Sequence, residues 1–322
     1  MRRWSCSLLA LLFVACAAEE QPLIRNFYHW ETELRLDSTE RDLLTGHDRL
    51  YVKAFDLVRE AGQAVPTAEI QLVDTVGLPR LVPVVFITNQ VILQLASDQI
   101  PTLADQIATL TEELLPANFP ELQLDCDWTA RTQVHYFELL KAVRERLRGT
   151  LVSCTIRLHQ YRDRQAQGIP PVERGVLMVY NTGDIEDWAT DNSIIDTNAL
   201  RNYLADQPPY PMPLDIAVAV YDWAAVYRRG ELVQLINEPD TLRMRDTSYF
   251  TLLPSTIPGT RVRAKKSTYF NGISLYRDDE LRYEAARPER VDREAQSIRD
   301  YVGHFPGQRL IIYRLGSRLW HD

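Results

Sequence analysis

Stretches typical of β-strands alternate with stretches typical of helices along most of this 322-residue chain, and this alternation constrains the fold more than any other feature. Eight short apolar or β-branched runs recur at residues 26–31, 50–56, 81–89, 122–128, 151–159, 175–181, 214–223 and 309–314. Such alternation favours a parallel sheet, and eight strand–helix units favour closure into a barrel. We therefore predict an α/β fold, a (β/α)8 TIM barrel over residues 25–322.

Helix-like segments separate the predicted strands at 38–44, 91–115, 130–148, 197–205, 231–237 and 288–302. The clearest is 130–148, where Val134, Phe137 and Leu140 recur near a period of 3.6. The unit around 161–171 is short and rich in proline, so we expect its helix to be reduced. The stretch 241–284 is too long for a simple loop and contains alternating apolar pieces, which predicts a small β insertion before the last helix and strand.

The first residues form an export signal. Arg2 and Arg3 precede a short apolar run that ends at Ala15, which predicts a signal peptide over residues 1–15. The segment LFVAC resembles the lipobox of bacterial lipoproteins, and the resemblance implies lipidation of Cys16 and a tether over 16–24. Cleavage by an ordinary signal peptidase is the alternative. We expect a lipid-anchored protein of the bacterial cell envelope, with the leaflet left open.

The composition and the motifs that are missing argue against several classes of function. The chain carries 36 Lys and Arg against 44 Asp and Glu, a formal charge of −8, and no basic block suited to nucleic acid. After the signal, no apolar run is long enough to cross a bilayer, so the only membrane contact expected is the lipid anchor. Phosphate-binding glycine loops, a Rossmann fingerprint and a GxSxG elbow are missing, and we predict neither cofactor nor metal.

Cys126 and Cys154 fall on neighbouring predicted strands, at positions assigned to the outer, helix-facing side. Two buried thiols and a disulfide formed after export are both compatible with this placement. The sequence leaves the choice open.

In a barrel, chemistry gathers where the strands end, so the polar and aromatic residues there are the candidate site. They are His29, Trp30, Glu31, Asp56, Thr88, Asn89, Asp125, Asp127, Trp128, Arg157, His159, Tyr180, Asn181, Asp222 and Trp223. The three tryptophans suit the stacking of sugar rings, although each alone is compatible with core filling. Together they favour a glycan cleft.

Asp125 and Asp127 are the sharpest element of this set. Residues two apart on a strand point the same way, about 6.5–7 Å apart, so the two carboxylates form a coupled pair of which one readily holds a proton. Arg157 and His159 on the next strand have the same spacing and can hold the pair. A purely structural Asp–Arg network and a metal site of Asp125, Asp127 and His159 are the alternatives.

The fourth predicted strand, LQLDCDWT, resembles the D-x-D-x-E region of family 18 glycoside hydrolases, the chitinase-like barrels. The sixth, LMVYN, resembles their M-x-Y-D/N motif. The resemblance implies that Asp127 orients an acetamido group of the substrate and that Tyr180 hydrogen-bonds its carbonyl. The acid that protonates the leaving group in that family is a Glu, and Thr129 holds its place here. Asp125, Met178 and Asn181 match the remaining motif positions.

Most of residues 25–322 also resembles a group of bacterial lipoproteins predicted to have glycoside-hydrolase-like barrels. This second resemblance implies no particular reaction. Replacement acids predicted from the sequence are Glu31, Asp222 and Glu284, the last folding over the mouth from the insertion. Each is equally compatible with a solvated loop carboxylate. A pair about 5–5.5 Å apart would suit a retaining glycosidase and about 6.5–9.5 Å an inverting one.

Three functions are compatible with these residues. The first is a glycosidase that uses Asp127 with a distant acid, and the second is a non-catalytic glycan-binding barrel. The third is an envelope scaffold whose barrel mouth is plugged. The partner expected in the first two is a glycan, and whether the protein is an enzyme stays open.

Overall fold

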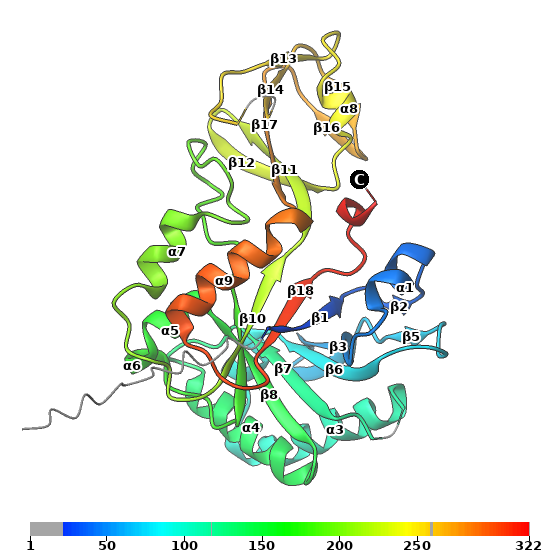
Figure 1. Cartoon of the computed structure of the whole chain (residues 1–322), viewed down its shortest axis with the longest axis vertical. Helices are drawn as coiled ribbons and strands as arrows, with labels where there is room; N and C mark the ends of the chain where they lie inside the picture. The colour runs from blue at the N-terminus through cyan, green and yellow to red at the C-terminus, as the bar shows by residue number, and fades with distance from the viewer. Residues whose placement is uncertain (1–21, 117, 258–259, 322) are drawn as a thin grey trace, which may run out of the picture.

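Eight strands form a closed parallel barrel in the computed structural model, which describes residues 22–116, 118–257 and 260–321 (Figure 1). Around the barrel they are β1 (Ile24–His29), β18 (Arg309–Tyr313), β10 (Leu214–Ala219), β9 (Arg174–Met178), β8 (Leu151–Arg157), β7 (Glu121–Cys126), β6 (Arg80–Ile87) and β3 (Arg49–Glu60). Pairing of β1 with β3 closes the ring. The predicted TIM barrel is confirmed.

Helices cover most of the outside of this barrel. They are α1 (Ser38–Leu44), α2 (Asn89–Leu93), α3 (Ile100–Leu114), α4 (Gln133–Arg146), α5 (Leu158–Arg162), α6 (Arg164–Gln167), α7 (Thr197–Leu204) and α9 (Val291–Val302). The fifth unit has only the short α5 and α6, as the proline-rich sequence predicts. After β3 the chain turns back as β4 (Gln63–Thr67), antiparallel to β3, and β2 (Glu33–Leu34) pairs with β5 (Gln71–Leu72).

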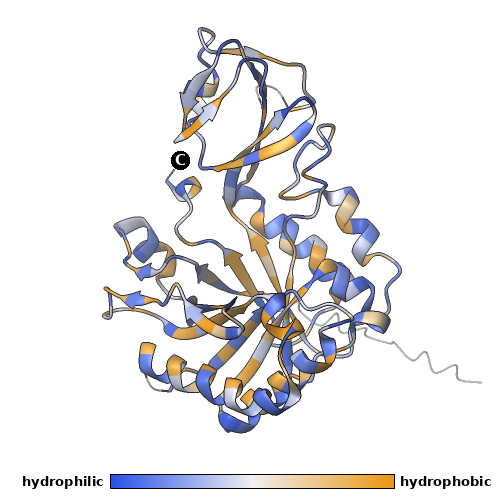
Figure 2. Cartoon of the chain, turned by 180° about the vertical axis from the view of Figure 1, so that it is seen from behind, coloured by the Kyte–Doolittle hydropathy of each residue, from blue (hydrophilic) through white to orange (hydrophobic). Residues whose placement is uncertain are grey.

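Strand β7 shows how the sequence sorts residues between the two sides of the barrel wall. All six of its residues are buried. Leu122, Leu124 and Cys126 pack in the large apolar core between strands and helices. Because successive side chains of a strand point to opposite faces, the alternate residues Glu121, Gln123 and Asp125 point into the barrel. Figure 2 shows the apolar colouring concentrated on the barrel strands.

The two cysteines belong to the apolar core outside the barrel wall. Cys126 and Cys154 are free, fully buried thiols, and both pack in that core. Burial raises the pKa of each thiol, which keeps both in the unreactive protonated form. Of the two alternatives that the sequence leaves open, the structure has the two buried thiols and not the disulfide.

A second layer of structure stands on the barrel mouth, inserted between β10 and α9 (Figure 1). Its antiparallel sheet has the order β12 (Glu231–Asn237), β11 (Tyr221–Arg228), β17 (Glu280–Ala286), β14 (Arg261–Ala264), β13 (Phe250–Leu252). A hairpin of β15 (Thr268–Phe270) and β16 (Ile273–Leu275) and the short α8 (Thr241–Met244) accompany it. Phe250, Phe270 and Leu281 belong to its own small core.

The insertion is larger than the sequence analysis predicts. It begins at Tyr221 rather than Thr241, and 231–237 is the strand β12, not a helix. A short apolar run does not distinguish helix from strand by its period. The informative signal is the turn: Arg229 and Gly230 both have positive φ, 56° and 86°, the conformation of a tight hairpin turn between β11 and β12.

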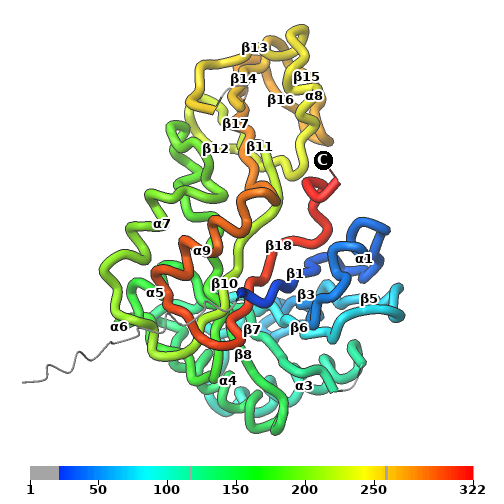
Figure 3. Tube along the Cα trace, viewed as in Figure 1, coloured from blue at the N-terminus to red at the C-terminus, as the bar shows by residue number. Residues whose placement is uncertain are grey.

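The chain enters the barrel at the start of β1, and after β18 its last residues run up to the insertion (Figure 3). The predicted signal peptide, Cys16 and most of the predicted tether lie outside the described residues. Within the described ranges, no helix is long and apolar enough to cross a membrane.

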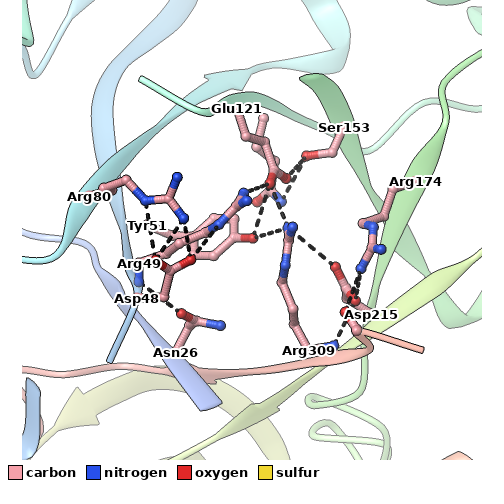
Figure 4. Close-up of polar contacts among 12 residues, drawn as sticks. Asn26, Asp48, Arg49, Tyr51, Arg80, Glu121, Ser153, Arg174, Asp215 and Arg309 are labelled. Atoms are coloured by element: carbon pink, nitrogen blue, oxygen red, sulfur yellow. Dashed lines mark hydrogen bonds and ion pairs between the residues drawn. The ribbon is translucent and has the colours of Figure 1, made fainter. Parts of the chain in front are cut away.

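Buried ion pairs fill the end of the barrel opposite the insertion (Figure 4). Glu121 Oε2 accepts hydrogen bonds from Arg49 and Arg309, both at 2.6 Å, and its Oε1 accepts one from Ser153 at 2.6 Å. Asp215 accepts from Arg174 at 2.7 Å and lies 3.7 Å from the Arg309 guanidinium. Because unpaired buried charges are strongly unfavourable, this network holds the barrel floor in one arrangement.

The ionisation of Asp215 makes the stability of the protein depend on pH. Burial outweighs the two arginines and raises the pKa of Asp215 to about 6 in the folded protein. Between about pH 4 and pH 6 the folded carboxyl keeps a proton that the unfolded chain has lost, so stability falls as pH rises. We predict that wild type loses about 3 kcal/mol relative to Asp215→Asn over this range. Urea unfolding of both proteins measures the two free energies of unfolding. A wild-type stability that stays constant or rises relative to Asp215→Asn between about pH 4 and pH 6 would contradict the prediction.

Candidate functional site

A cavity of about 440 Å³ opens at the carboxyl ends of the barrel strands, beneath the insertion. Its walls combine aromatic rings with charged and amide side chains. They come from Trp30, Asp56, Phe86, Asp125, Asp127, Arg157, Tyr180, Asn181, Tyr221, Asp222, Trp223, Asn237, Glu238, Tyr313 and Arg314. Seven residues that the sequence places at barrel strand ends line it together, and Asp222 and Trp223 join them from the insertion. The seven are Trp30, Asp56, Asp125, Asp127, Arg157, Tyr180 and Asn181.

The Asp125–Asp127 pair is held by one arginine, as the strand spacing predicts. Arg157, the last residue of β8, donates from Nη2 to Asp125 Oδ1 at 3.2 Å and from Nε to Asp127 Oδ1. Thr155, two residues earlier on β8, donates to Asp125 Oδ1 at 2.6 Å. Only 3% of the Asp125 side chain is exposed, against 51% for Asp127.

The surroundings of Asp125 change its pKa. Burial raises the pKa of Asp125, while Arg157 and the hydrogen bond from Thr155 pull that pKa back down. The negative charge of Asp127 adds to the rise. Asp125 therefore takes up a proton more readily than an ordinary aspartate, whereas Asp127 lies exposed at the surface of the cavity.

Aromatic rings form one wall of the cavity. Tyr180 stacks on Tyr313, with ring centroids 5.3 Å apart and planes at 14°. Trp30 meets Tyr313 edge-on at 5.8 Å. The Tyr180 hydroxyl contacts Met178 Sδ at 3.0 Å, and Asn181, in the left-handed region at φ 55°, accepts a hydrogen bond from Tyr221. Together these rings form an aromatic surface on which a flat face of a ligand can pack.

Asp222 and Trp223 join the insertion to this cavity. Both are almost fully buried and both line it. Asp222 accepts hydrogen bonds from Arg318 and, at 2.9 Å, from the Tyr283 hydroxyl. Asp222 is thus an anchoring carboxylate for the C-terminal segment, a role that its strand-end position does not reveal.

Glu284 does not line the cavity and is not placed to act as the predicted acid. Its Oε1 accepts from Arg282 at 2.5 Å, and its Oε2 accepts from the Ser193 amide and hydroxyl, both at 2.6 Å, and from Trp223 Nε1 at 3.1 Å. Glu284 and Arg282 side chains are both fully buried. Its register on β17, opposite Trp223 on β11, turns the carboxylate into the junction between insertion and barrel.

Three further predicted residues lie outside the cavity walls. Glu31 is exposed and pairs with Arg314, and His159 is half-buried at the start of α5, where burial lowers its pKa. Trp128 is fully buried on the outer side, stacked on Tyr136 at 5.3 Å, and is therefore core filling rather than part of a glycan cleft. No group of His, Cys, Asp and Glu side chains in the described ranges is arranged to hold a metal ion.

Sequence reasoning missed Glu238 and Arg314, which close one side of the cavity. Arg314 follows β18 and donates to Glu31 on the barrel rim and to Glu238 of the insertion, the latter at 2.6 Å. Arg314 ends the last predicted strand run, so the strand-end rule could have found it. Glu238 follows β12, whose assignment as a helix hid it.

Comparison with known proteins shows what this fold is like. No protein-family model matches the chain, and no curated protein matches it. A chitinase from Chromobacterium violaceum has a TM-score of 0.56 and 10% identity over 93% of this chain and 97% of that one. A GH18 chitinase from Cycas revoluta, solved with (GlcNAc)4, has a TM-score of 0.56 and 9% identity over 92% and 96%.

The Bacillus cereus spore cortex-lytic enzyme SleL also shares the fold, with a TM-score of 0.51 and 13% identity over 94% of this chain and 74% of that one. At these identities the likeness shows the fold alone. The shared feature is the eight-stranded α/β barrel fold, which is also the fold of the two chitinases.

The shared arginine gives a direct test of the site. Removing its positive charge in Arg157→Gln takes away the main attraction that lowers the pKa of Asp125. We predict that this substitution raises the pKa of Asp125 further, as measured by carbon-13 NMR titration of the Asp125 carboxyl. Arg314→Gln, at the other side of the cavity, is the matched control and leaves that pKa unchanged. The geometry would be contradicted by an Asp125 titration that is the same in both variants.

The structural role of Glu284 is tested by stability. Glu284→Gln leaves the buried Arg282 charge without its partner and is expected to reduce the free energy of unfolding by about 3–5 kcal/mol. Glu280→Gln, on the same strand, breaks an exposed pair with Arg263 and is expected to change it by less than about 1 kcal/mol. Equal effects in denaturant unfolding would show that Glu284 is not the anchor described here.

Proposed function

We propose that this protein is a glycan-binding barrel of the bacterial cell envelope, exported and held at a membrane by a lipid on Cys16. The glycan lies in the cavity at the barrel mouth. The arginine pair and small-residue cysteine site at the N-terminus support export and anchoring, and the fold and cavity support the ligand class.

The composition of the cavity carries this proposal. Sugar rings present an apolar face bordered by hydroxyls, and they suit a wall of rings such as Trp30 and Tyr313 beside carboxylates such as Asp127. The volume of about 440 Å³ is in the range of pockets for small ligands. A plugged scaffold is disfavoured because the mouth is open. The Cycas revoluta chitinase of the same fold holds (GlcNAc)4, which supports an oligosaccharide as the ligand.

Two observations favour binding without cleavage. Thr129 stands where the family 18 motif has its acid, does not line the cavity, and a hydroxyl does not protonate a leaving group at a useful pKa. Asp127 already accepts a hydrogen bond from Arg157. The site therefore lacks a free proton donor at the motif position.

Hydrolysis is the second candidate, favoured by one observation. Burial raises the pKa of Asp125, and a carboxyl that retains its proton is what a glycosidase acid requires. In this alternative Asp125 takes the place of the missing Glu, and Asp127 is the second carboxylate.

Glycan-array binding of the purified protein tests the proposal, followed by assay of the bound glycans for new reducing ends. We expect saturable binding, at least about tenfold weaker in Trp30→Phe and Asp127→Asn because each change removes a contact in the cavity. Trp128→Phe is the matched control, since that ring lies outside the cavity, and its binding should equal wild type.

Each outcome has a distinct meaning. Binding without new reducing ends supports the binding barrel, and cleavage abolished by Asp125→Asn would replace it by the hydrolase. Absence of binding from a folded protein across a broad array would overturn both.

A further inference from the structure

Carboxylates around the cavity outnumber the cations that neutralise them. Five line it, Asp56, Asp125, Asp127, Asp222 and Glu238, against two arginines, Arg157 and Arg314. Two of the five have a cation of their own behind the wall. Lys53 pairs with Asp56 at 3.1 Å, and Arg318 pairs with Asp222.

The other carboxylates share their cations. Arg157 serves both Asp125 and Asp127, and Arg314 serves both Glu238 and Glu31 of the rim. With Glu31 counted, six carboxylates face four cations, a surplus of two negative charges. Protonation of Asp125 would still leave a surplus of one.

Oxygen atoms at these shared pairs lack partners. Asp125 Oδ2, Asp127 Oδ2 and Glu238 Oε2 accept no hydrogen bond from the part of the chain that the structure describes, although Asp125 is 3% exposed. Glu121 and Glu284, by contrast, use both oxygens, and Asp215 Oδ2 on the barrel floor has no hydrogen bond from the described residues but lies 3.7 Å from the Arg309 guanidinium. A buried carboxylate oxygen left open toward a cavity is a site for a donor from a ligand.

We propose that the glycan of this site carries free amino groups, so that the cavity takes a de-N-acetylated hexosamine unit whose ammonium lies against Asp125 and Asp127. This inference rests on the proposed function and specifies its ligand. An ammonium supplies three donors and one positive charge, so it can donate to the open oxygens of Asp125 and Asp127 and neutralise one of the two surplus negative charges. The sugar ring then lies against Trp30 and Tyr313, the rings of the same cavity.

Other glycans meet the charge surplus less well. An N-acetylated or plain neutral sugar supplies donors but leaves the surplus unbalanced in a partly desolvated site. A glycan bearing carboxylates or sulfates adds repulsion. The cavity therefore discriminates by charge among glycans that share one ring shape.

Calorimetric titration with three tetrasaccharides tests this inference: a β-1,4 glucosamine tetramer, its N-acetylated counterpart, and the glucose tetramer, all at a pH where the amine is protonated. We expect the glucosamine tetramer to bind at least about tenfold more tightly than either neutral one. Raising the salt from about 0.02 M to about 0.5 M should reduce this preference, because a charge contribution at a partly open site is screened.

Charge-removing variants locate the preference. Asp127→Asn and Glu238→Gln should each reduce the ratio of affinities by about threefold or more. Glu138→Gln removes an equal charge from the exposed face of α4, away from the cavity, and should leave the ratio unchanged. Oligolysine of the same charge is the probe for unspecific attraction and should not compete.

The outcomes separate this inference from the function on which it rests. Equal or tighter binding of the N-acetylated tetramer would overturn the amino-sugar inference and leave glycan binding intact. Competition by oligolysine, or an equal loss in Glu138→Gln, would overturn it as unspecific attraction. Failure of all three tetramers and of the array would overturn the proposed function itself.

Discussion

Pairing of charges inside the barrel is the constraint on which the rest of this structure depends. Strand β7 carries an inward carboxylate near each end, and the two are treated differently. Glu121 at the floor has both oxygens hydrogen-bonded and contacts two arginines, of which Arg309 also lies near Asp215. Asp125 at the mouth shares Arg157 with Asp127 and leaves an oxygen open. The paired charges make the floor a structural plug, whereas at the mouth one arginine shared by two carboxylates leaves room for a ligand to bind.

The insertion adds the other half of the site without loosening the barrel. Its sheet is fixed by Glu284, which joins β17 to the loop at Ser193 and to Trp223, and by Asp222, which holds the C-terminal segment through Arg318. From this fixed position it supplies Trp223 and Glu238 to the cavity. Arg314 then links Glu238 to the barrel rim. The cavity thus lies between the barrel and the insertion, which are connected by buried polar contacts.

The barrel and the Asp125–Asp127–Arg157 cluster could be predicted because they rest on local periods. Alternation of strand and helix fixes the fold class, and a spacing of two on a strand fixes a shared face. Glu284 and Trp128 could not be assigned, since their surroundings come from distant segments: Ser193 and Arg282 for one, Tyr136 and Gln167 for the other. Glu238 was hidden by a run whose period is ambiguous, and the turn at Arg229–Gly230 was the missed signal.

A crystal structure of the protein with a bound oligosaccharide would show where the ligand lies relative to the shared arginine, Arg157. We expect one sugar ring against Trp30 and Tyr313, with a polar group of that ring within hydrogen-bond distance of Asp125 or Asp127. A sugar held elsewhere on the molecule, with the cavity at the barrel mouth empty, would contradict this expectation.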